Sequence, residues 1–160
     1  MALLRINGLI EESIVDGPGI RYVVFTQGCE HHCPGCHNPQ THDLHGGFLI
    51  ETDEIVHAIS ENPLLQGITF SGGEPFLQPA PLATLGKAVH ALGLDVVTYT
   101  GFTYECLKED PNPDIQALLG VTDLLIDGPF VSDLKNTALP YRGSTNQHLI
   151  PLSERILPYL

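Results

Sequence analysis

The chain has 160 residues, 42% of them hydrophobic, which suits one compact domain spanning residues 1–160. Lysine and arginine number 7 against 19 acidic residues, so the formal net charge of −12 disfavours nucleic acid as a direct partner. The sequence contains no apolar stretch of about 18 residues and no signal-peptide core near its start, so we expect a cytoplasmic protein without a membrane partner.

The first half of the chain predicts three strands and one helix. Residues 21–26 are β-branched and aromatic, which is typical of a buried strand, and residues 3–10 predict an earlier strand. Residues 52–60 predict a helix, because Thr52 can cap it, acidic residues follow, and the apolar residues share one face. Residues 68–70 predict a short strand that runs into a glycine-rich turn.

The second half continues the alternation of helices and strands. A helix carries Leu82, Leu85 and Val89 at helical spacing and ends at Gly93. The elements expected after it are a strand at 95–99, a helix at 114–119, a strand at 123–126 and a last strand at 148–150. This order predicts an α/β fold with a mainly parallel sheet and covering helices. A complete eight-unit barrel typically needs about 250 residues, so we expect an incomplete, partial TIM-type barrel.

Three cysteines, Cys29, Cys33 and Cys36, lie close together directly after the strand at 21–26. In a reducing compartment, clustered cysteines bind metal more often than they form disulfides. Thiolate is the soft ligand that iron–sulfur clusters and zinc prefer. Three thiolates would hold three irons of a [4Fe–4S] cube and leave the fourth iron open to another ligand.

Other interpretations of the cysteines remain open at this stage. A zinc site could be completed by His31, His32 or His37, since three cysteines and one histidine are a common zinc set. The three thiols could also be unrelated. Cys106 lies far away in a segment of helical character, and we expect it to be a small buried hydrophobe rather than a fourth ligand.

Two further polar segments follow predicted strands. Gly72, Gly73 and Glu74 come after the strand at 68–70, where the glycines allow close approach of a ligand to the backbone. Asp127 ends the strand at 123–126 and could accept hydrogen bonds from ribose hydroxyls or bind a cation. Each segment alone is equally compatible with an ordinary turn. Because ligands bind at the carboxyl ends of parallel strands, we expect both segments near the cysteine loop.

Taken together, these segments resemble the radical S-adenosylmethionine enzymes, which carry three cluster cysteines at this spacing followed by a Gly-Gly-Glu-Pro segment. The chain is more specifically similar to activases of glycyl radical enzymes, and most of all to those of the anaerobic ribonucleoside-triphosphate reductase. The resemblance covers most of the chain and includes several motifs in order, at residues 13–21, 36–39, 99–101, 126–130 and 142–147.

The resemblance implies two cofactors, a [4Fe–4S] cluster and S-adenosylmethionine, and no catalytic side chain beyond them. Cys29, Cys33 and Cys36 would bind the cluster. The cofactor-binding set that the resemblance implies is Gly35, Cys36 and His37 at the nucleoside, Gly72, Gly73 and Glu74 at the amino group, and Asp127 at the ribose or a cation. Pro129 stands where formate-lyase activases tend to carry a lysine, so the resemblance names no ligand for the methionine carboxylate.

The implied reaction is the reductive cleavage of S-adenosylmethionine to a 5′-deoxyadenosyl radical, which removes a hydrogen atom from a glycine of the partner enzyme. For the most similar subgroup the partner is the anaerobic ribonucleoside-triphosphate reductase, and the electron donor is a flavodoxin or ferredoxin. One alternative is the activation of pyruvate formate-lyase or another glycyl radical enzyme. An alternative from another class is a non-catalytic zinc-binding interaction module.

Overall fold

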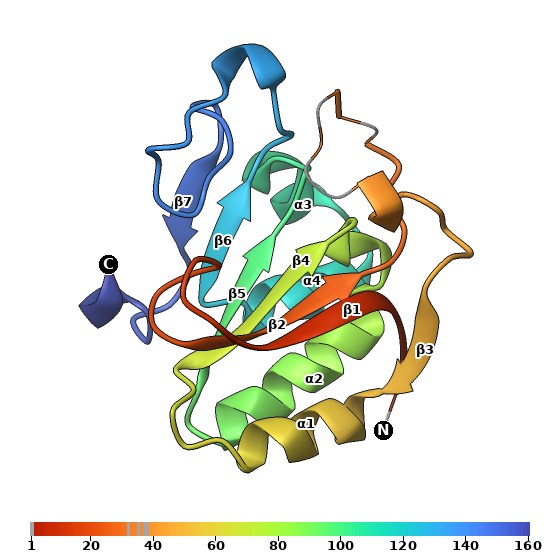
Figure 1. The fold of residues 1–160 in the computed structure, drawn as a ribbon, viewed down its shortest axis with the longest axis vertical. Coiled ribbons are helices and arrows are strands. Elements are labelled where there is room, and N and C mark those ends of the chain that lie inside the picture. The colour runs from red at the N-terminus through yellow and green to blue at the C-terminus, as the bar shows by residue number, and fades with distance from the viewer. Residues whose placement is uncertain (1, 32, 35, 37–38) are drawn as a thin grey trace.

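The computed structural model of the chain describes residues 2–31, 33–34, 36 and 39–160. Its centre is a seven-stranded sheet in the order β3-β1-β2-β4-β5-β6-β7 (Figure 1). The strands are β1 Leu3–Ser13, β2 Arg21–Thr26, β3 Phe48–Glu51, β4 Gly67–Gly72, β5 Asp95–Tyr99, β6 Leu124–Asp127 and β7 His148–Pro151. Every strand expected from the sequence is present, within a few residues of its expected bounds.

The middle of the sheet is parallel and its flanks are antiparallel. Strands β2, β4, β5 and β6 pair in parallel, whereas β1 and β7 pair antiparallel with β2 and β6. The flanks reverse direction because no crossover helix separates β1 from β2 or β6 from β7. The expectation of a mainly parallel sheet with covering helices is confirmed. The outer strands β3 and β7 do not pair with each other in the described part of the chain, so the barrel is open.

Strand β3 was not predicted from the sequence. It lies at the edge of the sheet and pairs with β1 alone. Its residues Phe48 and Leu49 are 50% and 53% exposed, so the strand lacks the buried apolar alternation by which strands are recognised.

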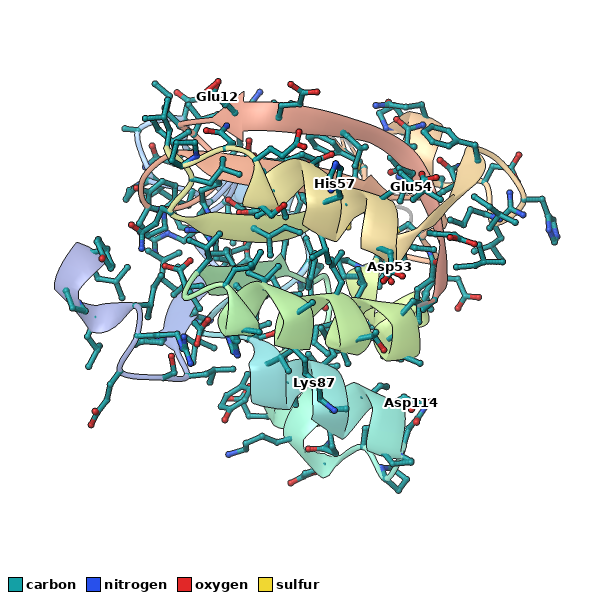
Figure 2. All side chains as sticks on the ribbon, turned by 90° about the horizontal axis from the view of Figure 1, so that it is seen from below. Glu12, Asp53, Glu54, His57, Lys87 and Asp114 are labelled. Atoms are coloured by element: carbon teal, nitrogen blue, oxygen red, sulfur yellow. The ribbon has the colours of Figure 1, made fainter. Side chains whose placement is uncertain are left out.

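The helices are α1 Thr52–Ser60, α2 Pro79–Ala91, α3 Tyr104–Glu109 and α4 Pro113–Val121. Figures 1 and 2 show α1, α2 and α4 side by side on one face of the sheet, and the labelled Asp53, Glu54 and Lys87 lie on α1 and α2. The expected cap of α1 is wrong by one residue. Glu51 is the N-cap residue and makes no side-chain cap bond, whereas the Thr52 hydroxyl accepts a hydrogen bond from the Ala2 amide. None of the described helices is long and apolar enough to cross a membrane.

The apolar core lies between the sheet and these helices. Strand residues such as Val24, Phe70 and Val96 pack there against helix residues such as Leu82 and Leu118. Burial of this apolar surface is the main force that holds the layers together. A smaller apolar cluster lies on the other face of the sheet and consists of Val97, Leu124, Ile126 and Ile156, with Tyr99, Tyr141 and Leu149 packed against it. This second face carries the cavity described next.

Candidate functional site

A cavity of about 380 Å³ opens at the carboxyl ends of the parallel strands. Its wall includes Cys29, Cys33 and Cys36 from the loop after β2, and Gly72 and Gly73 from the end of β4. Residues that follow β5 and β6 complete it, among them Thr100, Gly101 and Gly128. The strand-end segments singled out in the sequence therefore converge on one cavity, as expected from the parallel arrangement. Its volume falls within the usual range for small-molecule sites.

The cysteine loop is tied to the protein through its backbone. Cys29 is buried at 8% exposure, and its amide donates to the His42 carbonyl at 3.3 Å. The amide of Cys36 donates to the carbonyl of Cys33 at 3.1 Å, which makes a tight turn between the two thiols. Gly35 and His37, which the resemblance places at the nucleoside, lie outside the described residues.

The residues present fit an iron–sulfur cluster, because thiolate is the soft ligand that such centres prefer. In the described part of the chain, no group of three His, Cys, Asp or Glu side chains is close enough to hold one metal ion. Yet all three cysteines line the same cavity. In a cubic cluster each thiolate binds a different iron, so the three sulfurs must surround a body wider than one ion. Thiolates spread around a cavity suit that requirement and match the chemical preference of iron–sulfur centres.

The glycines at the end of β4 are required by close backbone approach. Gly72 has φ +95°, and a Cβ there would lie 2.5 Å from the Thr26 amide nitrogen. A Cβ on Gly73 would collide with the carbonyl oxygen of Gly28. The amide of Gly73 donates to Thr26 at 2.8 Å, and that of Glu74 donates to Gly28 at 2.7 Å. Backbone hydrogen bonds therefore hold this turn against the start of the cysteine loop, and both segments line the cavity.

Glu74 is 1% exposed and supports the cavity from behind rather than lining it. Its Oε1 accepts hydrogen bonds from His31 Nε2 at 2.5 Å and from the Gly101 amide at 2.7 Å. The Thr100 hydroxyl donates to the same carboxylate at 2.9 Å, and the Phe76 amide donates to Oε2 at 3.0 Å. One carboxylate thus joins the ends of β4 and β5 to the cysteine loop.

His31 lines the cavity between two of the cysteines in sequence. Its hydrogen bond to Glu74 is the main reason that its pKa is raised above the ordinary histidine value, against the opposing effect of burial. Its ring also packs edge-on against Phe102, with the ring centroids 4.6 Å apart. The sequence suggested His31 only as a possible zinc ligand. Its contact with Glu74 links segments 43 residues apart and carries no local signal.

Asp127 ends β6, and its carboxylate accepts hydrogen bonds from two other segments of the chain. Its Oδ2 accepts from the Tyr104 amide at 2.8 Å, and its Oδ1 accepts from His148 Nδ1 at 3.1 Å and from the His148 amide at 3.3 Å. Asp127 is 2% exposed and is absent from the described cavity wall, whereas Gly128 next to it is part of that wall. The carboxylate therefore positions the end of β6, the start of α3 and β7.

The segment at 142–147 is fastened to the end of β6. The Gln147 side chain accepts from the Gly143 amide at 2.8 Å and donates to the Gly128 carbonyl at 2.9 Å. The Asn146 side chain donates to the Pro129 carbonyl at 2.8 Å. These bonds bring Arg142, Gly143 and Gln147 into the cavity wall, which the sequence alone did not predict. Val15 and Asp16 from the 13–21 motif, and Tyr99 and Tyr141 from the second apolar face, also line the cavity without having been predicted as site residues.

The expectation for Cys106 is wrong. It lies on α3 and is exposed rather than buried, because the inward-facing residue of this short helix is Leu107. It is absent from the described wall of the cavity, which the other three cysteines line.

Comparisons with known proteins agree with this architecture. A family model described as "4Fe-4S single cluster domain" matches residues 15–150. The anaerobic ribonucleoside-triphosphate reductase-activating protein of Salmonella typhi is 39% identical over 152 residues, which are 90% of this chain and 96% of that protein. The corresponding protein of Escherichia coli K12 is 35% identical over 84% of this chain and 90% of its own length.

Two further similarities are more partial. The pyruvate formate-lyase-activating enzyme of Clostridium pasteurianum is 36% identical over 83% of this chain, but the match covers 56% of that enzyme. The crystal structure of QueE from Escherichia coli matches with a TM-score of 0.51 at 16% identity, over 63% of this chain and 53% of that chain. At that identity the likeness supports the α/β fold alone.

The fold, the cysteine loop and the match over residues 15–150 define the class: the chain belongs to the family of single-cluster 4Fe–4S domains. Within it, the chain belongs with the anaerobic ribonucleoside-triphosphate reductase-activating proteins, as the identities of up to 39% over nearly the full length show. The resemblance stated from the sequence is thereby confirmed, and so are the enzyme class and the two cofactors, a [4Fe–4S] cluster and S-adenosylmethionine, at the level of the family.

Proposed function

We propose that this chain generates a glycyl radical on an anaerobic ribonucleoside-triphosphate reductase. The observation that carries the proposal is that Cys29, Cys33 and Cys36 line the same cavity as Gly72 and Gly73. The relatives of this chain are named as activating proteins of that reductase. Activation of pyruvate formate-lyase is the second candidate function, because the activating enzyme of Clostridium pasteurianum is 36% identical to this chain. It is less favoured, since this chain spans only 56% of that enzyme.

The chain's own residues would hold the cofactors in a fixed geometry. Cys29, Cys33 and Cys36 would bind three irons of the cluster, and the main chain at Gly72 and Gly73 would meet the amino group of S-adenosylmethionine. When bound, these cofactors supply a one-electron cleavage of the sulfonium bond and the removal of a hydrogen atom from a glycine Cα of the partner. Glu74 would act through His31, Thr100 and Gly101, which it holds against the cavity.

The other expected contacts complete the proposal. The main chain of Gly35, Cys36 and His37 would contact the nucleoside. Asp127 would act as a positioning residue, since its carboxylate already accepts bonds from Tyr104 and His148. Positioning of this kind matters because a reactive intermediate is useful only in a site of fixed geometry from which water is excluded.

The partner has to reach the cavity from outside. Val15 lines the cavity and is 69% exposed, and its neighbour Ile14 is 75% exposed, so the rim is apolar and accessible on this side. An apolar rim around an open cavity suits a loop of a large protein substrate. We also propose a flavodoxin or ferredoxin as electron donor, a cytoplasmic location, and no nucleic-acid partner, in keeping with the net charge of −12.

An anaerobic assay tests the proposal. The reconstituted protein is reduced in the presence of S-adenosylmethionine, and the release of 5′-deoxyadenosine and methionine is measured. Addition of the anaerobic reductase is expected to give a glycyl-radical doublet by electron paramagnetic resonance, whereas pyruvate formate-lyase is expected to give none. A signal with the lyase alone would favour the second candidate, and the absence of 5′-deoxyadenosine would reject both.

A further inference from the structure

Arg142 stands out in the cavity wall because of its charge. Among the described residues that line the cavity, it is the only lysine or arginine, and Asp16 is the only aspartate or glutamate. The chain as a whole has 7 basic residues against 19 acidic ones, so a basic side chain in the cavity wall differs from the mostly acidic charge of the rest of the protein. Among the described residues Arg142 forms no salt bridge, whereas the buried Arg21 pairs with Asp95.

The guanidinium of Arg142 has a donor that the folded chain leaves unused. Its Nε is buried and has no hydrogen-bond partner within the part of the chain that the structure describes. Its Nη1 makes a single long bond, 3.4 Å, to the Gln147 carbonyl. A guanidinium has five N–H donors in a rigid fork, and buried donors are nearly always satisfied in native proteins. An acceptor from outside the chain would satisfy this one.

The backbone beside Arg142 is held in an unusual conformation. Tyr141 has φ +62° and is the only non-glycine residue with positive φ among those described. Its side chain packs against the apolar cluster of Val97, Leu124 and Ile126. A bulky residue in this region persists only where the surroundings enforce it, and such residues gather at binding sites. Here the packed ring fixes the turn that brings Arg142 into the cavity wall.

The turn is fastened from its other side as well. The Gln147 side chain accepts from the Gly143 amide, and the Ser144 hydroxyl donates to Asn146 Oδ1 at 2.6 Å. The same Gln147 donates to the Gly128 carbonyl, which ties the turn to the end of β6. The backbone that carries Arg142 is thus held by contacts on both sides, which lowers the entropy cost of ordering this turn on binding.

We propose that Arg142 binds the methionine carboxylate of S-adenosylmethionine, through Nε and the guanidinium edge. This inference rests on the proposed function. It names a binding residue for the methionine carboxylate, for which the sequence analysis found none. The choice of the carboxylate follows from the cofactor's charges. Its sulfonium and ammonium are cationic at neutral pH, and the carboxylate is its only anionic group, so it is the acceptor that a guanidinium pairs with most strongly. A planar fork facing a carboxylate is the strongest pairing that arginine makes.

The test compares two ligands on the oxidised, cluster-loaded protein without reductant, so that binding is measured and turnover is absent. The ligands are S-adenosylmethionine and decarboxylated S-adenosylmethionine, which lacks the carboxylate and keeps the sulfonium, amine and nucleoside. For Arg142→Gln we expect about 10-fold to 100-fold weaker binding of S-adenosylmethionine, the usual effect of losing a charged hydrogen bond. Binding of the decarboxylated compound should change less than about threefold.

Two further variants make the comparison decisive. Arg142→Lys keeps the charge but loses the fork, so its loss for S-adenosylmethionine should lie between those of wild type and Arg142→Gln. Arg155→Gln removes the same charge from a half-exposed position outside the described cavity wall and should bind both ligands as wild type does. Iron content and visible absorption report whether each variant keeps its fold and cluster. If Arg142→Gln fails to fold, Arg142→Lys alone carries the comparison.

The outcomes separate this inference from the function on which it rests. An equal loss for both ligands would mean that Arg142 supports the cluster or the loop, and would overturn the inference. Unchanged binding of both ligands would overturn it too, while the proposed function would stand. Failure of the wild-type protein to bind S-adenosylmethionine at all would count against the proposed function itself.

Discussion

His31 Nε2 lies 2.5 Å from Glu74 Oε1, so the cysteine loop after β2 is joined directly to the turn after β4. His31 is partly exposed at the cavity, whereas Glu74 is buried behind it. The same carboxylate accepts bonds from Thr100 and Gly101 after β5. A single buried side chain therefore sets the relative position of three strand ends, and the cavity depends on it.

Glu74→Gln should lower the free energy of unfolding by about 2 kcal/mol, because an amide keeps one acceptor oxygen and places an NH₂ against donors that need the other. Urea unfolding of the cluster-loaded protein measures this. Glu12→Gln removes the same charge at an exposed position on β1 (Figure 2) and should change stability by less than about 0.5 kcal/mol. Equal effects of the two substitutions would show that Glu74 has no special structural role.

Cys33→Ala should abolish stable incorporation of the cluster, because only two thiolates of the loop would remain to hold it. The measurement is bound iron and sulfide together with visible absorption after anaerobic reconstitution. Cys106→Ala is the matched control, since Cys106 is exposed on α3 outside the described cavity wall, and it should retain a full cluster. Loss of the cluster in Cys106→Ala would mean that this cysteine is a ligand after all.

Arg21, the last residue of the 13–21 motif, forms a buried ion pair with Asp95. Arg21 is 0% exposed, and it also donates to Thr69 Oγ1 at 2.7 Å and to the Pro18 carbonyl at 3.0 Å. Burial lowers the pKa of Arg21, and the carboxylate of Asp95 opposes that effect. Arg21→Ala should therefore cost about 3–5 kcal/mol of stability, since it leaves a buried carboxylate without its partner.

A double substitution tests this explanation of the pair. Arg21→Met combined with Asp95→Leu leaves no uncompensated charge, so its loss of stability should be smaller than the sum of the two single losses. Denaturant titrations of the three variants give the coupling energy. Additive losses would mean that the two side chains act independently despite their contact.

The buried phenol of Tyr99 is expected to make the protein less stable at alkaline pH. Burial raises the pKa of Tyr99 well above its usual value near 10. A raised folded-state pKa contributes stability that is fully present below the unfolded-state pKa and is lost as the pH rises above it. The free energy of unfolding should thus fall above about pH 10, by up to about 1.4 kcal/mol per pH unit for this one group.

Tyr99→Phe keeps the ring and removes the titrating hydroxyl, so the decline above about pH 10 should become shallower. Unfolding experiments at several alkaline pH values, with a parallel ultraviolet titration of tyrosinate, supply the measurement. Tyr159→Phe at an exposed position is the control and should leave the slope unchanged. An identical slope in wild type and Tyr99→Phe would refute a raised pKa at this residue.

Much of the architecture was predictable because its signals are local. The β-branched run at 21–26, the spacing of the apolar residues in α2 and the left-handed Gly93 after it are properties of short segments. The parallel order of the central strands followed from their alternation with helices. Strand β3 was not predicted because an edge strand needs no alternation of buried apolar residues. The burial of Cys106 was predicted wrongly because a six-residue helix has too few residues to define its buried face.

The sequence by itself determined the chemistry, since three cysteines in one loop and a glycine-rich turn at a strand end specify soft metal ligands and an accessible backbone wherever the chain places them. Tertiary structure decided which polar groups face the cavity. Asp127 and Glu74 accept hydrogen bonds from residues 23 and 43 positions away in the sequence. Arg142 lies at the cavity wall with an N–H donor that has no partner in the described part of the chain. Such assignments depend on contacts between distant segments, and only the packing of the whole chain creates those contacts.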